Sequence, residues 1–164
     1  MTAQPVSPTP GANAALRADD LRELSTRELM DLFRKGCAPT SLAALEGDPR
    51  GVGIGLHFWS RGRIDRWLRR RTTKERFLWH GKSFRMKSDA EGWGFNRAGR
   101  GPLLAVFPFK TSLGPSVIDG EPSVIIDYDV PRNPWWERLT WDELREVAPG
   151  VYLGVTTLRL FKRH

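Results

Sequence analysis

The chain has 164 residues, one cysteine and a formal net charge of +7 at pH 7. A chain of this length is near the usual size of one domain and can bury enough surface to fold without crosslinks. The single cysteine, Cys37, excludes an intramolecular disulfide framework and a cysteine-rich metal site.

The N-terminal residues 1–18 are rich in proline, alanine, threonine and serine and contain few large apolar side chains. Such a segment cannot offset the entropy lost on ordering, so we predict a disordered tail followed by a single domain over residues 19–164. The start of the chain lacks the pattern of a secretion signal, and no run approaches ~18 apolar residues. We therefore expect a soluble, cytoplasmic protein.

The first predicted element is an N-terminal helix. Ser25 and Glu28 have the spacing of a capping box, in which each side chain bonds to the other residue's backbone amide. An apolar stripe follows and Gly36 ends it; the stripe consists of Leu29, Met30, Leu32 and Phe33. We expect this helix to plug or flank a sheet.

Residues 51–59 are predicted to form a strand with one bare face, because Gly51, Gly53 and Gly55 alternate with apolar residues. A short basic helix is predicted next. Its apolar side contains Ile64 and Trp67, and its arginines are candidates for contact with an anionic surface: Arg66, Arg69, Arg70 and Arg71. Clustered arginines are more often a solvated face than a binding site.

No helix-turn-helix, zinc-finger or RNA-recognition pattern accompanies this cluster, so the sequence does not favour a nucleic-acid partner. Contact with a membrane surface is possible but is not favoured.

The remaining chain predicts an antiparallel sheet. Alternating apolar residues predict strands at residues 75–87, 92–96 and 103–109, and Asp119-Gly120 predicts a tight turn between residues 116–118 and 123–128. A proline-, tryptophan- and acid-rich connection then leads to a last strand from Val151. We interpret the runs on either side of this connection as consecutive strands. The predicted fold is mainly β (α+β), an antiparallel barrel with two helices.

Several short motifs are shared with a known family. They are Trp79-His80-Gly81-Lys82-Ser83-Phe84, Ile126-Asp127-Tyr128-Asp129 with Pro131, Trp136-Glu137-Arg138, Val147 and Leu153-Gly154. Over residues 28–160 the chain resembles the bacterial GXWXG family and the domain of unknown function that follows it. That family has a W-x-G-K-x-F element, a Y-D-x-x-P segment and an L-G near its end. The resemblance implies a lipocalin-like or calycin-like barrel and no established activity.

Three residues are candidates for catalysis. Strand alternation places His80 and Lys82 on one face with Phe84, where desolvation could lower the pKa of the lysine and make it a base or nucleophile. The alternative is a lysine whose stem covers apolar surface while its ammonium stays in water. Asp127 could form an acid–base pair with Asp129, although binding of loop amides or arginines fits their position at a strand end better.

The aromatic residues suggest where a ligand would bind. Most fit a barrel interior or its lining. The adjacent Trp135 and Trp136 cannot easily share one core, so they are candidates for a lid over the barrel mouth or for packing beneath the connection. The predicted ligand-binding residues are Lys82, Trp93, Phe95, Asn96, Tyr128, Trp135 and Trp136.

No metal or cofactor is predicted. The three histidines lack ligand spacing, and nothing marks one of them as a proximal haem ligand. We expect a barrel that binds an apolar or amphipathic small molecule in its interior. The alternatives are an isomerase or cyclase acting on an apolar substrate in the same barrel, and an interaction module that uses the arginines.

Overall fold

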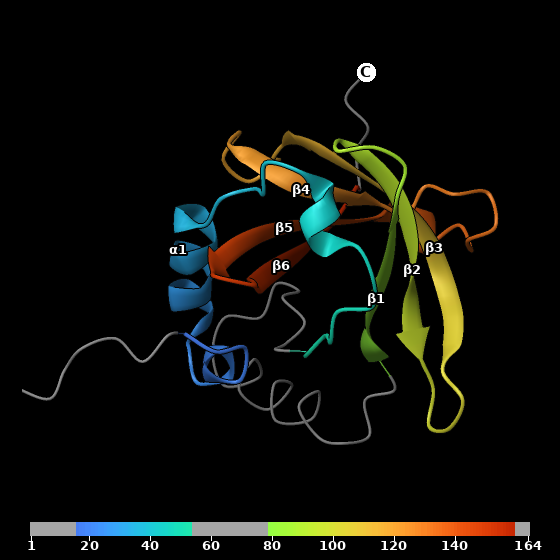
Figure 1. Cartoon of the computed structure of the whole chain (residues 1–164), viewed down its shortest axis with the longest axis horizontal. Coiled ribbons are helices and arrows are strands. Elements are labelled where there is room, and N and C mark those ends of the chain that lie inside the picture. The colour runs from blue at the N-terminus through green and yellow to red at the C-terminus, as the bar shows by residue number, and fades with distance from the viewer. Residues whose placement is uncertain (1–15, 54–78, 160–164) are drawn as a thin grey trace, which may run out of the picture.

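The structure of the protein is a computed structural model that describes residues 16–53 and 79–159 (Figure 1). One α-helix, α1, spans Thr26–Lys35, and three short 3-10 helices are η1 (Asp20–Arg22), η2 (Leu42–Leu45) and η3 (Glu137–Leu139), all within these residues. The described strands are β1 (Trp79–Met86), β2 (Glu91–Ala98), β3 (Leu104–Pro115), β4 (Pro122–Asp127), β5 (Thr140–Ala148) and β6 (Val151–Leu158).

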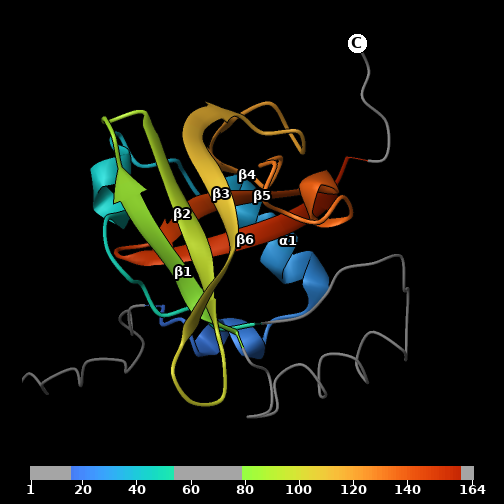
Figure 2. The ribbon, with the colours of Figure 1, turned by 90° about the vertical axis from the view of Figure 1, so that its right-hand side faces the viewer.

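The six strands form one antiparallel sheet in which spatial order follows chain order, from β1 to β6. The sheet curls strongly, and in Figure 2 the pair β5–β6 crosses the β1–β3 layer at a steep angle. The result is a half-barrel. The predicted mainly β, antiparallel architecture is confirmed, whereas the described strands β1 and β6 do not pair to close a barrel.

The concave face of the half-barrel holds the main apolar core. Alternate residues of each strand point inward, and η2 adds Leu42 and Leu45. The other buried members are Phe84, Phe109, Val124, Ile126 and Tyr128. These side chains line the inside of the curl and hold its strands around a common centre.

Helix α1 packs on the opposite face of the sheet, against β5 and β6. Its N-terminus has the predicted capping box: the Glu28 amide donates to the Ser25 hydroxyl, and the Ser25 amide donates to the Glu28 carboxylate. Phe33 is fully buried in a second cluster with Leu21 and Leu153. The capping-box prediction is therefore confirmed, and the helix flanks the sheet.

Three expectations about the strands were wrong. The acid-rich connection contains a whole strand, β5, so β4 and β6 are not neighbours. Residues 116–118 belong to the loop between β3 and β4, because β3 continues to Pro115. Residues 51–53 form no strand. The rest of that predicted strand, the basic helix with Arg66, Arg69, Arg70 and Arg71, and residues 1–15 lie outside the described residues.

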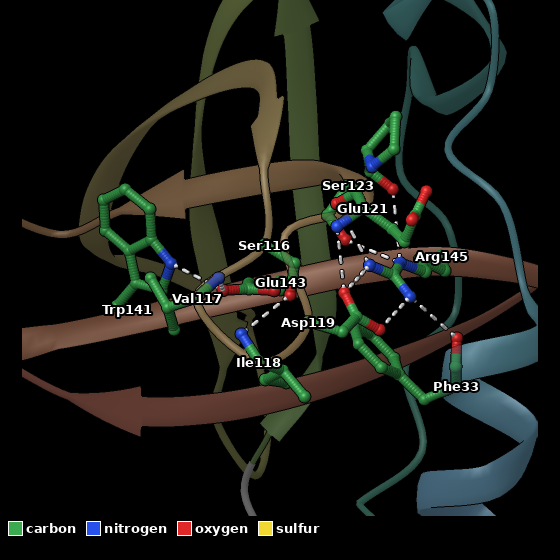
Figure 3. Close-up of polar contacts among 11 residues, drawn as sticks. Phe33, Ser116, Val117, Ile118, Asp119, Glu121, Ser123, Trp141, Glu143 and Arg145 are labelled. Carbon is green, nitrogen blue, oxygen red and sulfur yellow. Dashed lines mark hydrogen bonds and ion pairs between the residues drawn. The ribbon is translucent and has the colours of Figure 1, made fainter.

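A buried arginine on β5 fastens the β3–β4 loop and α1 to the sheet (Figure 3). The Arg145 side chain is inaccessible to solvent and makes a two-pronged ion pair with Asp119, at 2.6 and 2.8 Å. Its remaining hydrogen bonds go to the Ser123 hydroxyl and to three backbone carbonyls, those of Phe33, Glu121 and Pro122. The guanidinium also lies 4.6 Å from the centroid of the Phe33 ring.

The ion pair makes folding stability depend on pH. Hydrogen bonds from the Arg145 guanidinium lower the pKa of Asp119 to about 2. A carboxylate whose pKa is lowered by folding stabilises the protein fully above its unfolded pKa of ~3.9 and loses that contribution as the pH falls through the folded pKa. We expect Asp119→Asn to remove this part of the stability at neutral pH. The fall in the free energy of unfolding between about pH 4 and 2 should then be smaller than in the wild type.

The measurement is urea unfolding followed over that pH range. The matched control is Asp31→Asn, whose carboxylate makes an exposed pair with Arg34 and should change stability by less than about 1 kcal/mol. If the free energy of unfolding of Asp119→Asn falls as steeply with decreasing pH as that of the wild type, the ion pair does not contribute in this way.

A glycine on β2 permits the tightest contact of the concave core. A Cβ at Gly94 would lie 2.0 Å from the Ser83 carbonyl oxygen and 2.6 Å from the Phe109 ring. We expect Gly94→Ala to destabilise the protein by about 3 kcal/mol, because strand backbone and a packed ring would both have to move. Chemical denaturation should show this, with Gly101→Ala as the control, since a Cβ there meets no atom within 4 Å.

Candidate functional site

Four polar side chains meet on the concave face, at the end of the half-barrel where β4 ends. They are Lys82 from β1, Asn96 from β2, Tyr128 directly after β4 and Asp142 from β5. The ladder explains why they meet: Lys82 pairs with Asn96 across β1–β2, and Ile126, two residues before Tyr128, pairs with Asp142 across β4–β5. Paired residues, and residues two apart, share one face of a sheet. We call these four residues the polar cluster.

Lys82 is the centre of the polar cluster. Its ammonium lies 2.8 Å from Asp142 Oδ2 and 3.0 Å from Asn96 Oδ1, and it donates a third hydrogen bond to the Tyr128 hydroxyl. The three ammonium protons therefore have three acceptors. The side chains of Lys82 and Asp142 are only 13% and 10% exposed, so this is an ion pair largely removed from water.

The other members complete the network. The Tyr128 hydroxyl accepts from Asn96 Nδ2 at 3.1 Å and donates to Asp142 Oδ2 at 3.1 Å. Trp79 Nε1 donates to Asn96 Oδ1 at 2.8 Å. One atom is left over: Asp142 Oδ1 is buried and has no hydrogen-bond partner. An orphaned carboxylate oxygen in the interior is unusual, because buried polar groups are nearly always satisfied.

Aromatic rings surround the ammonium. Lys82 Nζ lies 5.1 Å from the ring centroid of Tyr128, 5.4 Å from that of Phe109 and 5.6 Å from that of Trp79. Such distances are within the range of cation–π attraction. The rings stabilise the charge and also give the cluster apolar walls.

The surroundings fix the protonation of both central groups. Burial opposes the charge on Lys82, but the Asp142 carboxylate and the Tyr128 hydroxyl outweigh it and raise the pKa of the lysine. Burial also raises the pKa of Tyr128, against the effect of the nearby ammonium. At neutral pH, Lys82 is therefore an ammonium and Tyr128 a neutral phenol. The sequence-based expectation of a lowered lysine pKa was wrong, and so was that of an ammonium left in water.

The loop between β4 and β5 borders the polar cluster. Asn133 fastens this loop, since its amide donates to the carbonyl oxygens of Tyr128 and Pro108, at 2.9 and 2.7 Å. Trp136 then packs edge-on against Phe107, with ring centroids 5.5 Å apart. Glu137 is half-buried; burial and the charge of Asp142 raise its pKa, while Lys82 lowers it. Trp136 and Glu137 thus form a rim.

A bulge in β3 shapes this rim. Gly94 pairs with Phe109 and Asn96 with Val106, so two residues of β3 lie opposite one residue of β2. One of the two, Phe107, has a φ of 50°, a left-handed conformation that is unusual for an aromatic residue. Strained backbone of this kind is often found at binding sites.

The structure brings together three of the predicted site residues, Lys82, Asn96 and Tyr128, and places Trp136 at their rim. Trp93 and Phe95 lie elsewhere: they pair with Arg85 and Ser83 and point to the convex face, where Trp93 is 53% exposed. The expectation that Trp93 and Phe95 point to the interior was wrong. Asn96 points to the concave face, and residues one or three positions away on the same strand point to the other face.

Trp135 is 75% exposed, and in the described part of the chain its ring does not pack against another aromatic ring.

The two other catalytic candidates also lie away from the polar cluster. His80 is exposed and bonds to the Gly99 carbonyl at 2.9 Å. The register of β1 shifts between Trp79 and Gly81, whose φ is 124°, so Trp79 rather than His80 shares a face with Lys82. Asp127 accepts from the Asp129 amide at 2.8 Å and pairs with Arg159 at 3.3 Å, as its position at a strand end suggested.

Sequence reasoning missed Asp142, Trp79 and Glu137. The segment Thr140–Ala148 alternates, but its inward positions carry Asp142 as well as Leu144, and its outward positions carry Glu143 and Arg145. Because charged residues occupy both inward and outward positions, the apolar–polar alternation typical of a strand cannot be recognised in this segment. The usable signal was the β-branched and aromatic start, Thr140-Trp141.

No group of three or more residues able to hold a metal ion occurs among residues 16–53 and 79–159. In the same part of the chain no helix is long and apolar enough to cross a membrane. Comparison with protein-family models, with curated proteins and with solved structures finds no match to this chain. The similarity to the GXWXG family stays a prediction.

The coupling between Lys82 and Asp142 is open to a double-mutant test. Lys82→Met should destabilise the protein by roughly 3–5 kcal/mol, because it leaves the Asp142 carboxylate buried without its partner charge. The double variant Lys82→Met/Asp142→Leu removes both charges and should recover most of that loss. Urea unfolding of the four proteins of the cycle measures the coupling.

The control pair is Arg138 with Asp129, an exposed ion pair at 2.7 Å for which a coupling below about 1 kcal/mol is expected. A coupling equally small for Lys82 and Asp142 would mean that the ammonium is hydrated rather than buried.

Proposed function

We propose that the protein binds a small, largely apolar molecule against the concave face of its half-barrel, with one polar group of that molecule directed at the polar cluster. The observation that carries this proposal is the contrast on that face: apart from Thr111, its buried side chains are apolar except for one cluster of hydrogen-bonding groups. Binding sites for small molecules have this composition, with apolar walls and a few polar groups that orient the ligand.

The rim supports the same proposal. Trp136 is 49% exposed although its ring packs on Phe107, so a broad apolar surface stands beside the polar cluster. The indole lies on a loop while the cluster lies on strands. A ligand held between them would contact polar groups carried by strands on one side and the indole of Trp136, carried by a loop, on the other. On this proposal the half-barrel is the ligand-binding part of a lipocalin-like or calycin-like barrel.

An isomerase or cyclase on the same scaffold is the second candidate. Lys82 does not suit the role of base, because its raised pKa keeps the amine protonated. Asp142 has a carboxylate oxygen without a partner, and a neutral Tyr128 can donate a proton or a hydrogen bond to a substrate oxygen. Asp142 as base and Tyr128 as acid would therefore replace the residues expected from the sequence.

The proposal predicts that an environment-sensitive apolar dye such as anilinonaphthalene sulfonamide binds the native protein, with increased emission. Trp136→Ala should weaken binding by at least about tenfold, since burying an aromatic side chain against a ligand contributes roughly 1.5–3 kcal/mol. Trp93→Ala is the matched control, because Trp93 is similarly exposed but lies on the convex face.

Equal losses of dye affinity in the two variants, or no binding to the native protein, would contradict the proposal. Circular dichroism of both variants checks that each is folded before titration.

A further inference from the structure

We infer that the molecule bound at the polar cluster is a neutral hydrogen-bond donor, an alcohol or a phenol on an apolar frame, whose hydroxyl group donates to Asp142 Oδ1. This inference rests on the proposed function and names the class of ligand that this site selects. It follows from the hydrogen bonds that the cluster has already made and from the one that it has not.

Most donors of the polar cluster are engaged. The Lys82 ammonium has Asp142, Asn96 and Tyr128 as acceptors, and the Tyr128 hydroxyl donates to Asp142 Oδ2. Trp79 donates to Asn96. A carbonyl or carboxylate ligand needs donors from the protein, and apart from the second N–H of the Asn96 amide it would have to break these bonds to obtain them. The lysine therefore orients the cluster and does not serve as an anchor for an anion.

The hydrogen-bonding atom of the cluster that has no partner is an acceptor, Asp142 Oδ1. Asp142 is 7% exposed, and its Oδ2 takes hydrogen bonds from Lys82 and Tyr128 while Oδ1 takes none. Leaving a buried acceptor unsatisfied is unfavourable. A ligand hydroxyl that donates to Oδ1 removes this cost, so the site gains affinity from an O–H group and gains none from an ether oxygen at the same position.

The charges of the cluster favour a neutral ligand over either ion. The ammonium of Lys82 offsets the carboxylate of Asp142, and the same ammonium already occupies the space among the rings of Trp79, Phe109 and Tyr128. A cationic ligand would meet that ammonium. An anionic ligand would meet Asp142 and, at the rim, Glu137, and it would lose its hydration without a free charged donor in return.

The test compares ligands that share one apolar frame: 2-naphthol, 2-methoxynaphthalene and 2-naphthoate. Calorimetric titration near neutral pH, where the naphthol is neutral and the naphthoate ionised, gives the affinities for the full chain. We expect 2-naphthol to bind at least about tenfold more tightly than the methyl ether, which has the same oxygen but no proton to donate. The naphthoate should bind most weakly.

A site variant checks where the preference arises. In Lys82→Met/Asp142→Leu the acceptor is gone and no charge is left unpaired, so 2-naphthol and 2-methoxynaphthalene should bind within about twofold of each other. Asp142→Asn, which keeps one oxygen but adds an N–H donor, should reduce the preference for the naphthol as well. A preference that survives in both variants would overturn the assignment to Asp142.

The outcomes separate the two proposals. If the naphthol and the ether bind the native protein equally well, or the naphthoate binds most tightly, the donor assignment is wrong while the proposed function stands. If none of the three compounds binds, and the dye does not bind either, the proposed function itself fails.

Discussion

The buried ion pair between Arg145 and Asp119 is the interaction on which the rest of the structure depends. The Arg145 guanidinium is fully buried, and it joins the β3–β4 loop, the start of β4 and the end of α1 to the middle of β5. A buried arginine is tolerated only when every donor has an acceptor, and Asp119, Ser123 and the surrounding carbonyls supply them. Because Asp119 lies in the loop, the same ion pair sets the position of the hairpin that brings β4 beside β5.

The position of β5 in turn creates the candidate site. Once Arg145 points to the convex face, alternation directs Asp142, three residues earlier, to the concave face. There it meets Lys82 across the curl of the sheet. The two faces of one strand thus carry two buried ion pairs, one that holds the fold together and one that orders a cluster beside an apolar surface. Buried ion pairs contribute little net stability; on the proposed function, the second pair orients the groups that meet the ligand.

Two backbone irregularities adjust the cluster. The shift at Gly81 turns Trp79 toward Asn96 and leaves His80 in solvent, and the bulge at Phe107 sets the ring on which Trp136 packs. Each irregularity changes which residues share a face, by one position. A regular strand would have presented His80 beside Lys82 and would have given the site a titratable imidazole in place of an indole donor.

The sequence by itself determined the local elements. The capping box of α1, the mainly β class, and the shared face of Lys82 and Phe84 follow from short-range rules: hydrogen bonding within one helical turn, and alternation along a strand. Only the tertiary structure decided that β5 is a strand, that Trp93 faces outward and that Lys82 is charged. Those outcomes depend on partners distant in the chain, since Asp142 and Arg145 are buried only because Lys82 and Asp119 lie opposite them. A local pattern cannot show that a charge will be neutralised by a residue sixty positions away.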